Sequence, residues 1–181
     1  MRTRLWRSAR IVFVETLIVC LWLSAFPSYR SFASDQVPYK GSAIGMITEQ
    51  VPIGTGDPLA PFGEPFLFVR AEAVGNFTHV GKAAVTLTYT ARLILIEGEV
   101  YMLASGIYTV VGADGSALTG PFTNKQRFGA EDFRAEVAVA GGTGRFRNTT
   151  GELIAVGKTF ADGSFFYDLE GMITSIGRAK R

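Results

Sequence analysis

The sequence contains very little of what common catalytic and metal centres require. Cys20 is the only cysteine and His79 is the only histidine among 181 residues. Catalytic triads and common zinc sites need partners that such a chain does not supply. We therefore expect no metal ion and no cofactor, and a fold that is stable without disulfide bonds.

Long apolar runs are also scarce, and the clearest one lies near the start, where residues 1–33 resemble a secretory signal. Four arginines, Arg2 to Arg10, precede a mostly apolar run over 11–26, and Ser31-Phe32-Ala33 has small residues at −3 and −1 of a cleavage site. A retained membrane anchor is the alternative. The run of 16 residues is shorter than the ~20 of a spanning helix, and Glu15 interrupts it. Cleavage after Ala33 is expected, giving a secreted or periplasmic protein.

An excess of positive charge is missing from the remainder of the chain. The formal charge of +2 includes five arginines and one glutamate within residues 1–33. Without them, 13 basic and 15 acidic residues remain, for a net charge near −2. This balance gives no general electrostatic reason to expect nucleic-acid binding.

The chain suits a single domain, and we divide it into three segments. After the signal at 1–33, residues 34–65 form a proline- and glycine-rich N-terminal segment with one strand-like run over 41–49. The rest of that segment, 51–65, reads as a long loop or a disordered connector, since closely spaced prolines disrupt ladders and helices. The β domain occupies 66–181, and Gly41 is its earliest start.

Period-2 alternation dominates from residue 66 onward. Residues 82–96 place Val85, Leu87 and Tyr89 on one face and threonines on the other, as in a half-buried strand. The run 100–111 is apolar on both faces, which indicates that its outer side is covered, for instance by another subunit. Further strands are expected at 66–77, 116–128, 133–140, 146–160 and 165–176. About eight short strands fit a closed antiparallel barrel or a β-sandwich.

The most distinctive stretch is Gly141-Gly142-Thr143-Gly144-Arg145-Phe146, with Gly151 shortly after it. Glycines allow positive φ angles, so a tight connection between strands is expected here. A phosphate-binding loop would need a helix to follow, and no helical period does. Arg145 should face solvent or a partner, and Phe146 should be a large apolar anchor.

This glycine motif resembles that of dirigent proteins and the related allene oxide cyclase barrels, including small secreted bacterial proteins of that type. Thr78-His79-Val80-Gly81 is similar to a Thr-His-Leu-Gly segment of those bacterial relatives, and 166–173 looks like their last strand. The resemblance extends from about Gly41 to Ile176. It implies an eight-stranded antiparallel β-barrel, often oligomeric, and favours the barrel over the sandwich. It does not settle activity, because the family includes cyclases and non-catalytic steering proteins.

A few polar residues are candidates for a site. His79 is either a hydrogen-bonded structural residue or a general acid or base. Asp168 and Glu170 share one face of the last strand, opposite Tyr167, and are either solvated outer charges or cavity acids. Candidates for ligand contacts are Tyr89, Arg92 and Tyr167.

Two functions of different classes follow. The first is an exported barrel that binds a small hydrophobic ligand or serves as a structural or interaction module, as a monomer or a homo-oligomer, without nucleic acid or stable membrane insertion. The alternative is a cofactor-free isomerase or cyclase acting on a hydrophobic substrate in the barrel cavity, since steering needs mainly shape and a few hydrogen bonds. A cavity lined by one of the candidate polar side chains would favour the enzyme.

Overall fold

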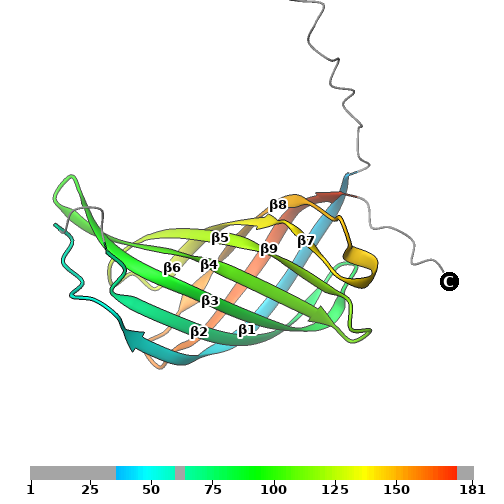
Figure 1. Cartoon of the computed structure of the whole chain (residues 1–181), viewed down its shortest axis with the longest axis horizontal. Helices are drawn as coiled ribbons and strands as arrows, with labels where there is room; N and C mark the ends of the chain where they lie inside the picture. Colours follow the sequence, from blue (N-terminus) through cyan, green and yellow to red (C-terminus); the bar gives the residue numbers. More distant parts are fainter. Residues whose placement is uncertain (1–35, 60–63, 175–181) are drawn as a thin grey trace, which may run out of the picture. The chain divides into compact units, whose positions relative to one another are not determined.

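The computed structural model describes residues 36–59 and 64–174, which form an all-β domain (Figure 1). Its strands are β1 (Gln36–Pro52), β2 (Leu67–Phe77), β3 (Gly81–Ile96), β4 (Glu99–Gly112), β5 (Ala117–Arg127), β6 (Asp132–Val139), β7 (Gly141–Gly142), β8 (Gly151–Thr159) and β9 (Ser164–Thr174), with one 3₁₀ turn, η1 (Gly144–Phe146). The predicted signal at 1–33 lies outside the described residues. Within the described ranges, no helix is long and apolar enough to cross a membrane.

The sheet closes on itself as an eight-stranded antiparallel barrel. Strands follow the order β4-β3-β2-β1-β9-β8-β6-β5, and β4 then pairs with β5, so no edge remains open. The short β7 adds two further pairings to β5 where β6 has left it. The predicted fold class is therefore confirmed, and the sandwich is excluded by the β4–β5 closure.

The barrel begins earlier than the sequence indicated. Strand β1 starts at Gln36 and runs to Pro52, inside the segment expected to precede the barrel. Its first residues pair only with β9, and pairing with β2 begins at Gly41. Pro38 lies where only β9 pairs with β1, so its missing N–H removes no hydrogen bond on the side without a neighbouring strand. Pro52 is the last residue of β1, and a proline is tolerated at both kinds of position.

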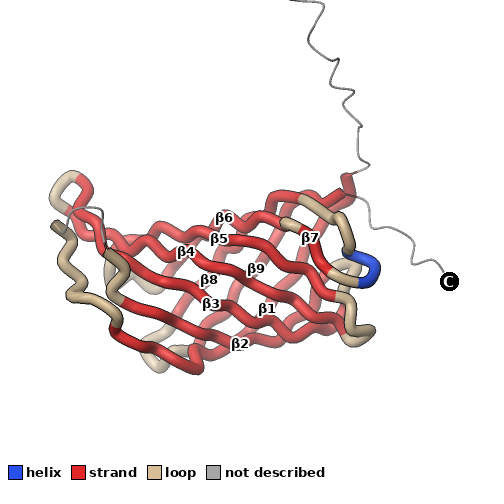
Figure 2. Tube along the Cα trace, viewed as in Figure 1, coloured by secondary structure: helices blue, strands red, loops and turns tan. Residues whose placement is uncertain are grey.

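The glycine motif also differs in one respect. A strand was expected from Phe146, but Gly144–Phe146 form the turn η1 and the next strand starts at Gly151. Gly144 has φ of +59°, a conformation that turns the chain back over the barrel end. Figure 2 shows this single helical turn at one end of the barrel, beside β7.

The two faces of each strand follow the predicted alternation. Val85 and Ala91 of β3 are buried, whereas Thr86 between them is exposed. Short turns link β2 to β3, β3 to β4, β4 to β5 and β8 to β9. Glu97 and Gly98, both with positive φ, connect β3 to β4 in the two-residue pattern that suits a twisted hairpin. Sequence periodicity thus determined which side chains enter the barrel.

Candidate functional site

A lumen cavity of about 230 Å³ lies inside the barrel. Several of its wall residues adjoin the turns at the end where β1 leads into β2, among them Gln50, Leu67 and Thr159. The wall is built from the inward face of the strands and comprises Ile47, Gln50, Leu67, Val69, Ala71, Leu87, Tyr89, Ala91, Met102, Ala104, Tyr108, Val110, Phe122, Asn124, Gln126, Phe133, Ala135, Val137, Ala155, Thr159, Phe165, Tyr167 and Leu169.

Small side chains create this space. Alanine occupies five wall positions, and two pairs of them face each other across neighbouring strands: Ala91 with Ala104, and Ala135 with Ala155. Each alanine leaves room that a leucine or phenylalanine would fill, so the cavity follows directly from residue size.

The opposite end of the barrel is packed solid. Phe146 and Ile173 are fully buried there, and Leu118 and Tyr39 are 1% exposed. The ring of Tyr39 stacks on that of Phe77, with centroids 6.2 Å apart. The lumen is therefore a pocket with one filled end rather than a channel through the barrel.

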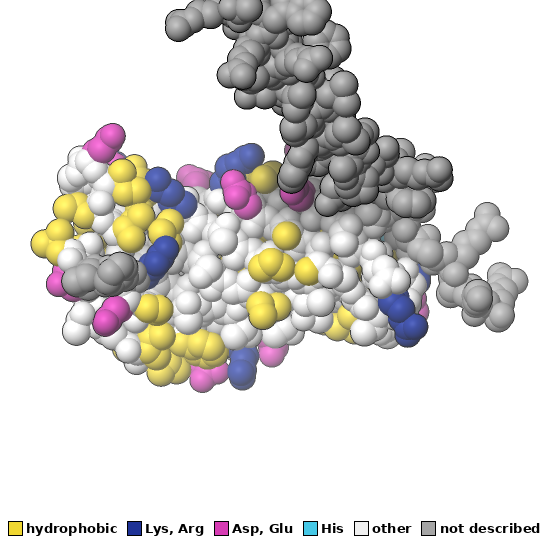
Figure 3. Space-filling view, turned by 45° about the horizontal axis from the view of Figure 1, so that its top comes forward, with side chains coloured by type: hydrophobic (Ala, Val, Ile, Leu, Met, Phe, Trp, Pro, Cys, Tyr) yellow, Lys and Arg dark blue, Asp and Glu magenta, His cyan; other side chains and the backbone are white. Residues whose placement is uncertain are grey.

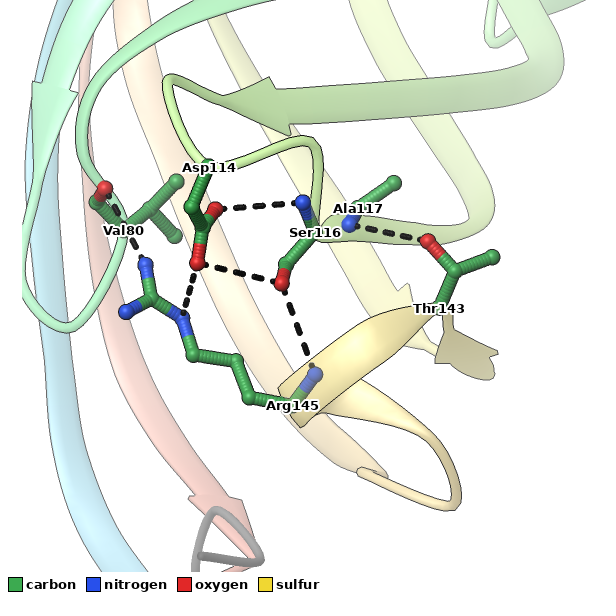
Figure 4. Close-up of polar contacts among 6 residues, drawn as sticks. All are labelled: Val80, Asp114, Ser116, Ala117, Thr143 and Arg145. Carbon is green, nitrogen blue, oxygen red and sulfur yellow. Dashed lines mark hydrogen bonds and ion pairs between the residues drawn. The ribbon is translucent and has the colours of Figure 1, made fainter. Parts of the chain in front are cut away.

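The glycine motif holds this filled end in place (Figure 4). Arg145 donates from Nη2 to the carbonyl of Val80 at 3.3 Å, and its Nε lies 3.5 Å from Asp114 Oδ2, an ion pair too long for a good hydrogen bond. The backbone N–H of Arg145 donates to Ser116 Oγ, and Thr143 Oγ1 accepts from the N–H of Ala117. Three separate turns are thereby tied together over the buried Phe146.

Asp114 is the anionic member of this cluster. The backbone N–H of Ser116 donates to it at 3.1 Å and holds its pKa below the ordinary value; the Ser116 hydroxyl and Arg145 act in the same direction. Arg145, which was expected to face solvent or a partner, is thus a half-buried cross-link within the chain, whereas Phe146 is the apolar anchor that the sequence indicated. All seven motif residues lie at the filled end and none lines the cavity.

Polar side chains on β5 form a short relay in the cavity wall. Asn124 donates from Nδ2 to Gln126 Oε1 at 2.8 Å, and Gln126 donates from Nε2 to the carbonyl of Ala130 at 3.1 Å. These two bonds fix which way each amide points. Asn124 Oδ1 is then left buried, with no hydrogen-bond partner in the described part of the chain.

Three tyrosines, together with Gln50 and Thr159, supply the other polar side chains of the lumen. Burial raises the pKa of Tyr89, Tyr108 and Tyr167 above the usual value of 10.0. The same holds for Tyr39 beneath them, where the neighbouring Tyr108 and Tyr167 add to the effect of burial. Tyr108 donates its hydroxyl to the carbonyl of Ala138 at 3.1 Å. These phenols remain protonated at neutral pH.

The buried tyrosines predict alkaline destabilisation. Above pH 10 the unfolded chain loses phenol protons that the folded chain retains. The contribution of these phenols to the free energy of unfolding is therefore fully present below pH 10 and is lost as the pH rises further. Each such tyrosine contributes at most about 1.4 kcal/mol per pH unit. Urea unfolding at pH 8, 10 and 11 measures how steeply the free energy of unfolding decreases with pH. Tyr167→Phe should make this decrease shallower, because it removes one phenol whose pKa burial raises. A decrease as steep as that of the parent protein would contradict the assignment.

The candidate residues from the sequence fall into two groups. Tyr89 and Tyr167 line the cavity. Arg92 lies on the outer face of β3, in a surface groove with Arg134 and Glu136.

The candidate acids and the histidine also lie away from the lumen. Asp168 and Glu170 are exposed on the outer face of β9, and Glu170 pairs with Lys40 at 3.6 Å. His79, with φ of 66°, sits in the turn between β2 and β3 and its Nε2 lies 3.1 Å from the carbonyl oxygen of Pro38. Within the described ranges, no group of three or more acids, histidines or cysteines could hold a metal ion.

Sequence reasoning did not single out Asn124 and Gln126. The signal was present, because both share a strand face with the buried Phe122. Polar residues that continue the inward face of a strand point toward the lumen by the same alternation that placed Tyr89.

Comparison with known proteins adds little to this description. No protein family profile matches the chain, and no curated protein matches it. One similar solved structure is that of a pterocarpan synthase dirigent protein, with 16% sequence identity, a TM-score of 0.46, and coverage of 83% of this chain and 95% of that one. The chain is thus similar to a dirigent protein, and its own strand pairings establish that it is a closed eight-stranded barrel.

Proposed function

We propose that this barrel binds one small, largely apolar molecule in its lumen cavity. The observation that carries the proposal is a space of about 230 Å³ with a mainly apolar and aromatic wall, closed at one end by the packed side chains around Phe146. A dry cavity of about 150 Å³ is enough for benzene, so this one suits a molecule of roughly two fused rings.

Binding is favoured over the alternative of an isomerase or cyclase. His79, Asp168, Glu170 and Arg92, which a proton-transfer role would use, lie outside the lumen. Tyr167 does line the cavity, which is the observation that would favour the enzyme, but burial raises its pKa and makes it a poor base near neutral pH. The polar groups of the wall are suited to orienting a ligand.

Association with a second copy of the chain is a further proposal, supported by the outer surface. An apolar row, which we call the outer row, crosses five neighbouring strands in register: Phe166, Ile44, Val74, Ala84 and Val111. Ile44 is 66% exposed and Val74 63%. Figure 3 shows apolar side chains at several places on the outer surface. Exposed apolar patches of this kind mark interaction sites, which keeps an interaction role as the second candidate function.

Export also remains a proposal, which rests on the sequence of residues 1–33. One experiment addresses ligand, processing and assembly together: native mass spectrometry of the protein purified from its own exported fraction. We expect a chain that starts at Ser34, in more than one copy, carrying a compact apolar molecule. A bare barrel that also takes up no added apolar compound would overturn the binding proposal.

Filling the cavity should abolish binding. In Ala135→Phe a ring enters the lumen, because Ala135 lies in the cavity wall and is 5% exposed. We expect the affinity for naphthalene, followed by calorimetric titration, to fall at least about tenfold, the effect of losing about 1.4 kcal/mol. Ala113→Phe, in the exposed turn after β4, is the matched control and should bind as the parent does. Equal loss in both variants, or in neither, would place the ligand elsewhere.

A further inference from the structure

Among the described residues, no side chain of the cavity wall carries a charge at neutral pH. None of the wall residues that the structure describes is an aspartate, glutamate, lysine, arginine or histidine, and tyrosines are the only titratable groups among them. A charged ligand would lose its hydration there without gaining an opposite charge, and such unpaired burial is costly. The lumen therefore selects against carboxylates and ammonium groups of the same shape.

Asn124 gives the wall a directional polar group. Its amide cannot turn without breaking the bond to Gln126, which is itself fixed by the carbonyl of Ala130. The orientation leaves Oδ1 as a buried acceptor without a donor in the described part of the chain. A buried acceptor in that state is a free-energy cost that a ligand donor would remove.

Tyr89 lies on the same part of the wall. Its ring meets that of Phe122 edge-on at 5.7 Å, and Phe122 precedes Asn124 by two residues on the inward face of β5. Tyr89 faces Gly106 of β4 in register, and Gly106 has no side chain to obstruct the tyrosine ring. A phenol hydroxyl can both donate and accept, so it complements an alcohol bound beside Asn124.

We propose that the barrel selects uncharged apolar molecules carrying a hydroxyl group, with Asn124 Oδ1 as the acceptor of the ligand's proton and Gln126 as the positioning residue. The inference rests on the proposed binding function and adds the chemical class of the ligand. It makes Asn124 the specificity-determining residue of the lumen.

Four probes of one shape test this in the exported protein by calorimetric titration at pH 7: naphthalene, 2-naphthol, 2-methoxynaphthalene and 2-naphthoate. The methyl ether keeps the oxygen but has no proton to donate, and the carboxylate adds a charge. We expect 2-naphthol to bind about tenfold more tightly than the ether, as one buried hydrogen bond allows. Binding of 2-naphthoate should be at least about tenfold weaker than that of naphthalene.

Two variants separate the roles of the relay residues. Asn124→Leu removes the acceptor, so the advantage of 2-naphthol over its methyl ether should disappear, measured as the ratio of the two affinities within the variant. Gln126→Leu keeps Asn124 but frees its amide to rotate and donate, so the ether should gain affinity relative to the parent. Thr123→Val, on the exposed outer face of β5, is the control and should change neither ratio. Thermal melts establish that each variant is folded.

The outcomes distinguish this inference from the proposed function. If no probe binds, the lumen is not a binding site and both proposals fail. If all neutral probes bind with equal affinity, or if Asn124→Leu leaves the preference for 2-naphthol intact, ligand binding stands and the selectivity assigned to Asn124 is wrong. If Asn124→Leu does not fold, the Gln126→Leu result decides, since an unchanged ether affinity there contradicts the relay.

Discussion

Replacement of Phe146 by alanine should lower the free energy of unfolding by about 3–5 kcal/mol, the usual cost of deleting a buried aromatic ring. Phe146 is fully buried at the filled end of the barrel. Its ring also lies under the Arg145 guanidinium, with 5.1 Å between the guanidinium carbon and the ring centroid. Removing it leaves a void that the surrounding strands, held in a closed ladder, cannot collapse to fill.

Urea unfolding followed by circular dichroism gives the measurement. Phe128→Ala is the matched control, because Phe128 is 56% exposed in the turn after β5. A surface truncation of this kind should change stability by no more than about 0.5 kcal/mol. If the two variants are equally stable, Phe146 does not close the barrel end as the structure indicates.

Gly144→Ala should be the other severe change, at about 2–5 kcal/mol. An alanine there would adopt a left-handed conformation, at about 1–2 kcal/mol, and its Cβ would collide with Ser116 Oγ, adding about 1–3 kcal/mol of overpacking. Ser116 cannot simply move away, since its hydroxyl donates to Asp114 and accepts from the backbone of Arg145.

Gly115→Ala separates the two costs, because it has the conformational cost without the collision. Gly115 has φ of +77° at the same end of the barrel, but a Cβ there would meet nothing within 4 Å. We expect it to lose only the conformational part, about 1–2 kcal/mol, in the same unfolding assay. A Gly144→Ala variant no less stable than Gly115→Ala would show that the contact with Ser116 relaxes freely.

Much of the fold could be predicted from the sequence because strand alternation is a local property. Tyr89 and the neighbouring threonines were assigned to opposite faces from their positions in one run of residues, and the structure has Tyr89 in the cavity wall and Thr86 exposed. The start of β1 was predicted too late because of Pro38 and Pro52. A proline argues against a strand only where the strand is paired with a neighbour on both sides, and neither proline of β1 is paired with both β2 and β9. That condition depends on strand order and not on the residues near Pro38.

The candidate site could be predicted only in part. Period-2 spacing showed that Asp168 and Glu170 share a face, but it left open whether that face is exposed to solvent or faces the lumen. Closure of β4 onto β5 decided it, because in a closed barrel the face shared with Tyr167 becomes the lumen and the other face meets solvent. The acids therefore lie outside.

The sequence by itself determined the all-β class, the alternation of faces and the need for glycine in the motif around Gly144, since each follows from backbone geometry within a few residues. Only the tertiary structure decided that five alanines surround one cavity, that Phe146 closes its far end, and that Asn124 Oδ1 has no hydrogen-bond donor among the described residues. Those properties depend on distances between strands far apart in the chain, and such distances are set by closure of the barrel.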